Sequence, residues 1–143
     1  MPFEQVLVAV DGSQQSHRAV LAARELTALS KGSIVLLHVE EALGLPGEGG
    51  GPGECGLEQP GEAGRLIARE SEAAREFGSP VRGEVVKGLA SEIATVIVER
   101  AEAEQADLIV MGSRGLSALS ALVVGSNAYK VLHLSNCPVL VVH

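Results

Sequence analysis

The chain has 143 residues, which is enough for one domain with a hydrophobic core and too few for two domains of ordinary size. Hydrophobic residues make up 46% and charged residues 20%, a balance typical of globular rather than disordered proteins. The net charge of −7 argues against a surface for nucleic acid or an anionic membrane, since either needs clustered lysine and arginine.

Two cysteines, Cys55 and Cys137, provide neither a metal-ligand pair nor a disulfide framework. The acidic residues Glu4 and Asp11 come too early for a signal peptide. No apolar run approaches the ~18 residues that a membrane-spanning helix requires. We therefore expect a soluble, cytoplasmic protein.

The first predicted strand covers residues 6–10, a continuous valine-rich run that ends at Asp11, Gly12 and Ser13. Continuous β-branched runs are typical of parallel strands that helices cover on both faces. Ser13 is suited to cap a following helix, which Lys31 and Gly32 close. The expected apolar face of this helix comprises Ala19, Ala22, Ala23, Leu26 and Leu29. Residues 34–39 form the second predicted strand.

Residues 44–64 interrupt this pattern with nine glycines and three prolines. Such a stretch cannot bury enough apolar surface to offset the entropy of ordering it, so we predict a mobile insert. Its glycines at 51, 53 and 56 match a G-x-G-x-x-G pattern formally. That match follows no strand and opens no helix, so we assign it to composition.

The alternation then resumes to the end of the chain. A helix at 65–77, a strand at 81–87 interrupted by Gly83, a helix after Gly88 and a strand at 107–111 precede a helix at 128–135 and a strand at 138–142. The apolar positions of these helices are Leu66, Ile67, Ala73, Ala74 and Phe77; Ile93, Val96, Ile97 and Ala101; and Ala128, Val131, Leu132 and Ser135. Alternating strands and helices predict a single α/β domain, with a parallel sheet between two layers of helices.

Glycines 112, 115 and 125, with Ser126 directly after the last, connect the fourth strand to the final helix. Glycine lets a backbone approach a ligand closely, and the start of a helix presents unpaired N–H groups to an anion. We therefore predict a phosphate cradle. Asp11 and Val39 end the first two strands, and ligands of open parallel sheets bind at such carboxyl ends.

Simpler interpretations of these residues stay open. Asp11, Gly12 and Ser13 could form only a turn and a helix cap, and residues 112–115 only a flexible connection. The four histidines (His17, His38, His133 and His143) show no metal-ligand spacing and fit helix-surface or strand positions. Cys137 is expected to be a buried or half-buried thiol, and Cys55 an exposed one.

The spacing Gly112-x2-Gly115-x9-Gly125-Ser126 resembles the nucleotide-binding signature of universal stress proteins. The segments VAVDGS at 8–13, DLIVMGSRG at 107–115 and CPVLVV at 137–142 are similar to that family too, so the resemblance covers essentially the whole chain. It implies a doubly wound sandwich with a five-stranded parallel sheet of order 3-2-1-4-5. Asp11 and Gly112 would then flank the point where the strand order reverses.

In ATP-binding members, the resemblance implies that Asp11 contacts the ribose, the Val39 backbone meets adenine and Gly112 lies by the sugar. Gly115, Gly125 and Ser126 would surround the phosphates, with Mg²⁺ or Mn²⁺ accompanying the nucleotide and no residue assigned as a metal ligand. Asn127 departs from the β-branched or small residue that the family often has there. The candidate nucleotide-binding residues are Val10, Asp11, Val39, Met111, Gly112, Arg114, Gly115, Gly125, Ser126 and Asn127.

We expect a regulatory protein that binds ATP, or ADP or AMP, and whose occupied and empty states differ in their contacts with a protein partner. No G-x-x-x-x-G-K-[S/T] segment supplies a P-loop lysine for hydrolysis. Two alternatives stay open: a slow ATPase or self-phosphorylating enzyme with Ser113 or Ser126 as acceptor, and a structural dimer module with a vestigial site. The apolar edge strand 138–142 predicts a homodimer, and the insert is placed to act as a lid.

Overall fold

The structure, a computed structural model, describes residues 3–42, 60–113 and 124–143. Arg114, Gly115 and residues 43–59, which include Cys55 and most of the predicted lid, lie outside this part. Strands and helices alternate along the described residues as β1 (Gln5–Ala9), α1 (Gln14–Ser30), β2 (Ser33–Glu41), α2 (Glu62–Arg75), β3 (Val81–Gly88), a 3₁₀ turn (Ala90–Glu92), α3 (Ile93–Ala103), β4 (Leu108–Gly112), α4 (Ser126–Leu134) and β5 (Val139–Val142).

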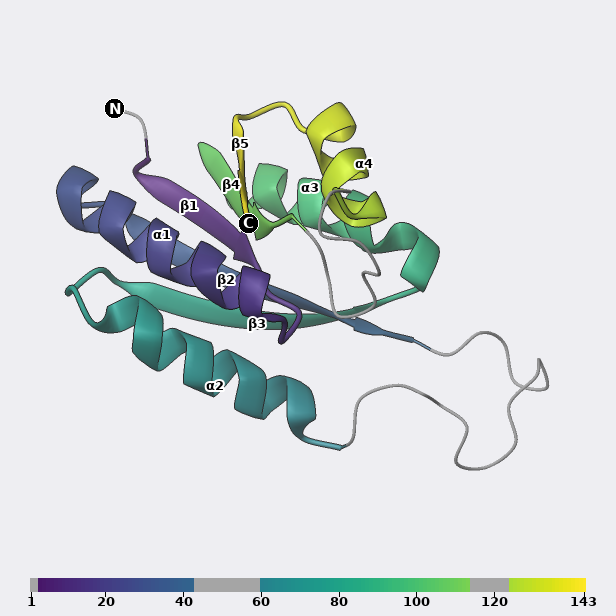
Figure 1. Ribbon diagram of the computed structural model, residues 1–143, viewed down its shortest axis with the longest axis horizontal. Helices are drawn as coiled ribbons and strands as arrows, with labels where there is room; N and C mark the ends of the chain where they lie inside the picture. The colour runs from purple at the N-terminus through teal and green to yellow at the C-terminus, as the bar shows by residue number, and fades with distance from the viewer. Residues whose placement is uncertain (1–2, 43–59, 114–123) are drawn as a thin grey trace.

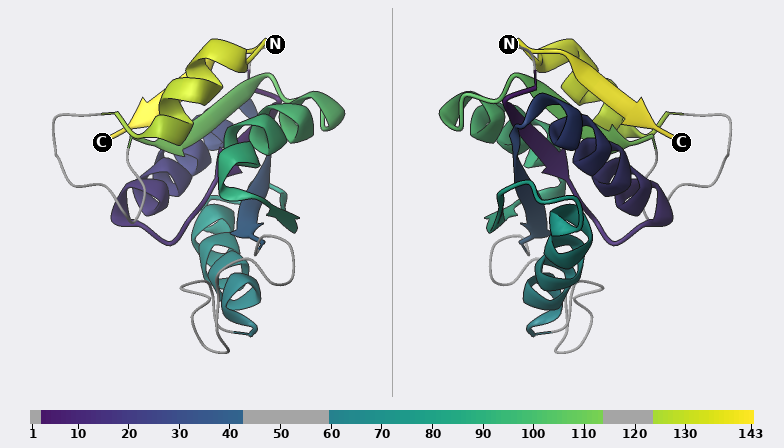
Figure 2. Two further views of the ribbon diagram at one scale, coloured as in Figure 1. Left: turned by 90° about the vertical axis from the view of Figure 1, so that its right-hand side faces the viewer. Right: turned by 90° about the vertical axis from the view of Figure 1, so that its left-hand side faces the viewer.

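The five strands form one parallel sheet in the order β3-β2-β1-β4-β5. Helices α1 and α2 cover one face of this sheet, and α3 and α4 cover the other (Figures 1 and 2). The predicted α/β fold and its strand order are confirmed. The crossovers leave β1 and β4, the two neighbours at the centre, toward opposite faces. None of the helices in the described residues is long and apolar enough to cross a membrane.

Two hydrophobic clusters join the layers, one on each face of the sheet. Alternate residues of a strand point to opposite faces, so Val6 and Val8 enter the cluster under α1 and α2, while Leu7 enters the cluster under α3 and α4. Both faces of the central strands are therefore buried under helices and shielded from water. This explains why their sequences are continuous apolar runs rather than alternating ones.

Helix α1 begins as predicted, with Ser13 Oγ accepting a hydrogen bond from the Ser16 N–H at 3.1 Å. Lys31, with φ of 60°, and Gly32 end the helix as predicted. One expectation for its second half is wrong. Leu29 is 85% exposed, because it lies two residues, or about 200° of helix rotation, from the buried Thr27.

Helix α2 and strand β3 also differ from expectation. Helix α2 begins at Glu62, so the last three residues of the predicted insert are helical. Phe77 lies beyond the end of α2 and is 49% exposed, with the Arg24 guanidinium carbon 4.4 Å from its ring centroid. Strand β3 is not interrupted at Gly83. A Cβ there would lie 2.3 Å from Cγ2 of Ile67, so α2 packs directly on the bare backbone.

Near the C-terminus, two further boundaries and one side chain differ from expectation. Gly112 is the last residue of β4 rather than the first of the loop, and α4 starts at Ser126, two residues early. Helix α4 buries Ala128 and Val131 against the sheet as predicted. Leu132, one residue or about 100° further round the helix, is 46% exposed.

Helix α1 and strand β4 touch backbone to backbone at Gly112. A Cβ at this position would lie 2.7 Å from Gln15 Cβ, 2.8 Å from the Gln15 carbonyl carbon and 2.9 Å from the Ser16 nitrogen. No side chain fits in that space. Glycine at 112 therefore lets the first turn of α1 rest on the end of β4.

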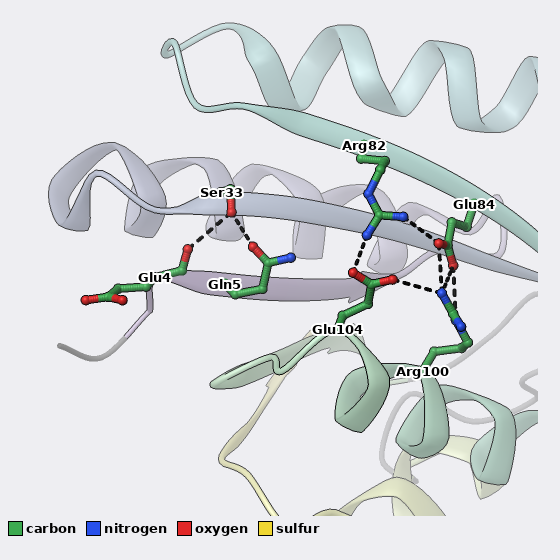
Figure 3. Close-up of polar contacts among 7 residues, drawn as sticks. All are labelled: Glu4, Gln5, Ser33, Arg82, Glu84, Arg100 and Glu104. Carbon is green, nitrogen blue, oxygen red and sulfur yellow. Dashed lines mark hydrogen bonds and ion pairs between the residues drawn. The ribbon is translucent and has the colours of Figure 1, made fainter.

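An ion-pair network ties the edge strand β3 to α3 (Figure 3). Arg100 Nη2 lies 2.8 and 2.7 Å from the two carboxylate oxygens of Glu84 and 2.8 Å from Oε1 of Glu104, while Arg82 contacts both carboxylates. Burial alone would raise the pKa of Glu84, but its hydrogen bonds with Arg82 and Arg100 and their charges lower it below the ordinary value. The network therefore favours the charged carboxylate.

We predict that Gly112→Ala destabilises the protein by about 1–3 kcal/mol, since the added methyl group must push the first turn of α1 away from β4. Urea unfolding at neutral pH measures this change. Gly64→Ala is the matched control: its Cβ meets nothing within 4 Å inside α2 and should add roughly 0.5–1 kcal/mol of stability. Equal stability of the two variants would contradict the close packing at Gly112.

We also predict that Glu84→Gln lowers the free energy of unfolding by about 1 kcal/mol at pH 7, as expected for a partly exposed ion-pair network. Because the folded pKa is lowered, this stabilisation is present above the unfolded pKa of about 4.3 and disappears as the pH falls through the folded value. Urea unfolding at pH 7 and at pH 3 measures the difference. Glu99→Gln, at an exposed position of α3, should show little effect at either pH.

Candidate functional site

Most of the predicted site residues lie together at the carboxyl ends of the central strands. Ala9 of β1 pairs with both Leu37 of β2 and Met111 of β4. The residues that follow these three therefore lie side by side, at the point where the strand order reverses, although β2 continues to Glu41 and β4 to Gly112. The described candidates at this end are Val10, Asp11, Val39, Met111, Gly112, Gly125, Ser126 and Asn127.

The turn after β1 is held by its own hydrogen bonds. Asp11 Oδ1 accepts the Ser13 N–H at 2.9 Å, and Gly12 between them has φ of 87°. Ser16 Oγ accepts the Asp11 N–H at 3.3 Å and donates to the Ser13 carbonyl at 3.1 Å. The turn-and-cap role, the simpler interpretation of these residues, is thus present. No described residue donates to Asp11 Oδ2, so half of this carboxylate is left for another partner.

The end of β4 is joined to the start of α4 and to β5 through Ser113. The Ser113 N–H donates to the Val142 carbonyl at 2.7 Å, and the Ser113 carbonyl accepts the Gly125 N–H at 2.6 Å. Gly125 is the N-cap of α4 and provides no side-chain cap. The N–H groups in the first turn of α4, from Ser126 onward, therefore lack a protein partner from a capping side chain.

The Ser113 hydroxyl is buried without a hydrogen-bond partner. The residue is 2% exposed, and its Oγ makes no hydrogen bond with any residue that the structure describes. Strand alternation directs its side chain to the α3 and α4 face, since Gly112 before it faces α1. Burial of a hydroxyl without a partner costs about 1–3 kcal/mol. Such a hydroxyl beside a helix start without a side-chain cap therefore indicates a binding position for a polar ligand.

The apolar candidates at the strand ends serve the core with their side chains. Val10, Val39 and Met111 are 3%, 9% and 6% exposed and belong to the two hydrophobic clusters. Only their backbone groups are therefore offered to a ligand. Next to them, the Nδ1 atom of the buried His38 lies 2.7 Å from the Val10 carbonyl oxygen.

Three residues of this region were missed or given another role by sequence reasoning. His38 was assigned to a plain strand position, Ser113 was considered only as a phosphate acceptor, and Ser16 was not considered. A signal for His38 was available, because a histidine within the apolar run IVLLHV needs a hydrogen-bond partner. No comparable signal marks Ser113 or Ser16, since their partners depend on how α1 and α4 pack.

Other candidates for chemistry lie elsewhere or are absent from the described residues. Within residues 3–42, 60–113 and 124–143, no three His, Cys, Asp or Glu side chains gather as a metal site. The half-buried Cys137, as expected, borders a groove of about 270 Å³ beside the amino end of β5. There, Asn136 donates to Glu102 at 2.6 Å. The groove is at the opposite end of the sheet from the predicted site residues.

Comparison with known proteins agrees with this arrangement. The model of the universal stress protein family matches residues 2–143. Universal stress protein YxiE of Bacillus subtilis is 36% identical over 98% of this chain and 99% of its own, and MJ0531 of Methanocaldococcus jannaschii is 34% identical over 98% and 82%. The Archaeoglobus fulgidus universal stress protein in complex with dAMP has a TM-score of 0.72 and 25% identity over the full length of both chains. The chain belongs to the universal stress protein family.

Proposed function

We propose that this protein binds ATP, or another adenine nucleotide, at the carboxyl ends of β1, β2 and β4, and that occupancy of this site regulates its contacts with a partner. In this proposal the Asp11 carboxylate takes the ribose hydroxyls through Oδ2. The Val39 backbone reads adenine, and Gly112 lies by the sugar. Gly125, Ser126 and Asn127 receive the phosphates, together with Arg114 and Gly115 of the connecting loop.

The observation that carries the proposal is the position of Ser113 next to the start of α4, where its carbonyl accepts the Gly125 N–H. The Ser113 hydroxyl is buried without a partner among the described residues, and the helix N-terminus lacks a side-chain cap. An anion with several oxygen atoms satisfies both. The relative solved with dAMP makes an adenine nucleotide the ligand class to test.

The described groups favour binding over hydrolysis. Asp11 is the only ionisable residue among the described candidates, and its Oδ1 is occupied by the Ser13 N–H. A single carboxylate neither positions a water molecule in line nor holds a divalent cation by itself. Mg²⁺ or Mn²⁺ would therefore arrive on the phosphates, and the serine hydroxyls would be its available contacts among the described candidates.

A thermal-shift titration with ATP, ADP and AMP, each with and without Mg²⁺, tests the proposal directly. A ligand at 100 times its Kd adds about 2.7 kcal/mol to the stability of the native state, which is easily measured as a rise in Tm. The three nucleotides also rank the phosphate contacts. An unchanged Tm at millimolar concentrations of all three would overturn the proposed function.

We predict that Ser113→Ala binds ATP at least about tenfold more weakly, because a hydrogen bond to a charged group contributes roughly 1.5–3 kcal/mol. Without nucleotide, this variant should have an equal or higher Tm, since the substitution removes a buried hydroxyl that has no partner. Calorimetric titration and thermal unfolding give the two values.

Ser79→Ala is the control with the opposite signs. Ser79 is also a buried serine, but it lies at the other end of the sheet, and its hydroxyl is 2.8 Å from Oγ1 of Thr27. This variant should lose about 1 kcal/mol of stability and keep its affinity for ATP. A Ser113→Ala variant that is destabilised but binds ATP normally would contradict the role proposed for its hydroxyl.

The same proposal includes a homodimer formed through β5. This strand lies at the edge of the sheet, is composed of Val139, Leu140, Val141 and Val142, and exposes 37% of Leu140. Its residues 138 and 142 bond to β4 through their carbonyls, so the peptide groups of Val139 and Val141 point to the open edge. An apolar edge with free peptide groups invites pairing with a second copy.

We predict that Val141→Pro gives a monomer, because proline removes the outward N–H of Val141 and leaves the bonds between β4 and β5 intact. Val141→Ala, which shortens the same side chain but keeps the N–H, should remain a dimer. Sedimentation velocity at micromolar concentration distinguishes the two states. A monomeric wild-type protein under these conditions would contradict the edge-strand dimer.

A further inference from the structure

Strand β2 continues past the end of β1. The last β1–β2 pair is Ala9 with Leu37, whereas β2 stays paired with β3 as far as Glu41. Successive peptide groups of a parallel strand point alternately to its two neighbours. The Ser33 N–H bonds to β1's side and the Ile34 N–H to β3's side, which sets the alternation. The N–H and C=O of Val39 therefore point to the β1 side, beyond the last pair.

The next bond of this ladder is missing, and a side chain has taken its place. The Val10 N–H donates to the Leu37 carbonyl at 2.9 Å, so a continued ladder would bring the Val39 N–H to the Val10 carbonyl. No backbone bond joins these two residues. His38 Nδ1 lies 2.7 Å from the Val10 carbonyl oxygen instead. Because a carbonyl only accepts hydrogen bonds, Nδ1 carries the proton.

The histidine is well placed to hold this arrangement. His38 is 3% exposed, and a short hydrogen bond in such surroundings is protected from competition with water. The ring leaves from the β2 residue immediately before Val39. One residue therefore both occupies the Val10 acceptor and fixes the backbone from which the Val39 peptide projects.

We infer that His38 is a positioning residue for base recognition: by holding the Val10 carbonyl, it keeps the Val39 N–H and C=O available for the edge of adenine. This inference rests on the proposed function. Adenine offers an acceptor at N1 and a donor at its 6-amino group, which match one N–H and one C=O. Guanine presents the reverse pattern on the same edge, so a free Val39 peptide selects adenine.

The hydrogen-bond exchange can be tested without any nucleotide. In His38→Phe, which keeps a ring but removes the donor, the Val10 carbonyl should accept the Val39 N–H. Amide hydrogen exchange by NMR should then show Val39 protected in the variant and less protected in the wild type. The His38→Asn variant, whose side-chain NH₂ occupies the place of Nδ1, should behave as the wild type. Equal protection of Val39 in all three proteins would overturn the inference.

The consequence for recognition is tested with ATP and 1-deaza-ATP, in which a C–H group replaces N1. Wild type and His38→Asn should bind ATP about tenfold more tightly than 1-deaza-ATP, the effect of one hydrogen bond. His38→Phe should bind both with the same weak affinity. Discrimination by His38→Phe equal to that of the wild type would overturn the inference. If the wild-type protein binds no adenine nucleotide, the proposed function falls, and Val39 exchange still decides whether His38 diverts the Val10 carbonyl.

Discussion

The backbone contact between Gly112 and the first turn of α1 is the constraint on which the candidate site depends. Gln15 and Ser16 rest directly on the end of β4, and Ser16 in turn bonds to both sides of the Asp11 turn. The loop after β1 and the end of β4 are therefore fixed relative to one another before any ligand arrives. Packing against α1 thus explains Gly112, the first glycine of the signature. Gly125, by contrast, leaves the start of α4 without a side-chain cap.

The fold was predictable because its signals are redundant. Continuous apolar runs such as 6–10 and 108–111 leave little choice besides central parallel strands, and their order followed from the family resemblance. The wrong assignments, Leu29, Phe77 and Leu132, are all large apolar residues at helix ends or helix edges. At such positions a shift of one residue rotates a side chain by about 100°. The spacing of apolar residues alone does not say where the contact between helix and sheet ends.

The polar half of the site was less accessible from sequence for a different reason. Whether a serine hydroxyl has a partner depends on strand register and helix packing, which no local pattern contains. Ser13 and Ser113 illustrate this: one caps α1 as its position predicts, and the other is buried without a partner. The Asp11 carboxylate serves the turn with one oxygen only, since the Ser13 N–H bonds to Oδ1, and Oδ2 is left for the contact that we propose.

Ser113 also gives occupancy a physical route to the rest of the molecule. Its N–H bonds to the last residue of β5, its carbonyl accepts the Gly125 N–H at the start of α4, and its hydroxyl is the group that we propose for a phosphate contact. A ligand that draws on this hydroxyl therefore acts on the residue that anchors the edge strand proposed to pair with a second copy. The described site offers main-chain groups and hydroxyls and a single carboxylate. This set of groups suits the binding of a nucleotide better than its hydrolysis. Regulation would then be exerted through α4 and β5, the two elements that Ser113 joins.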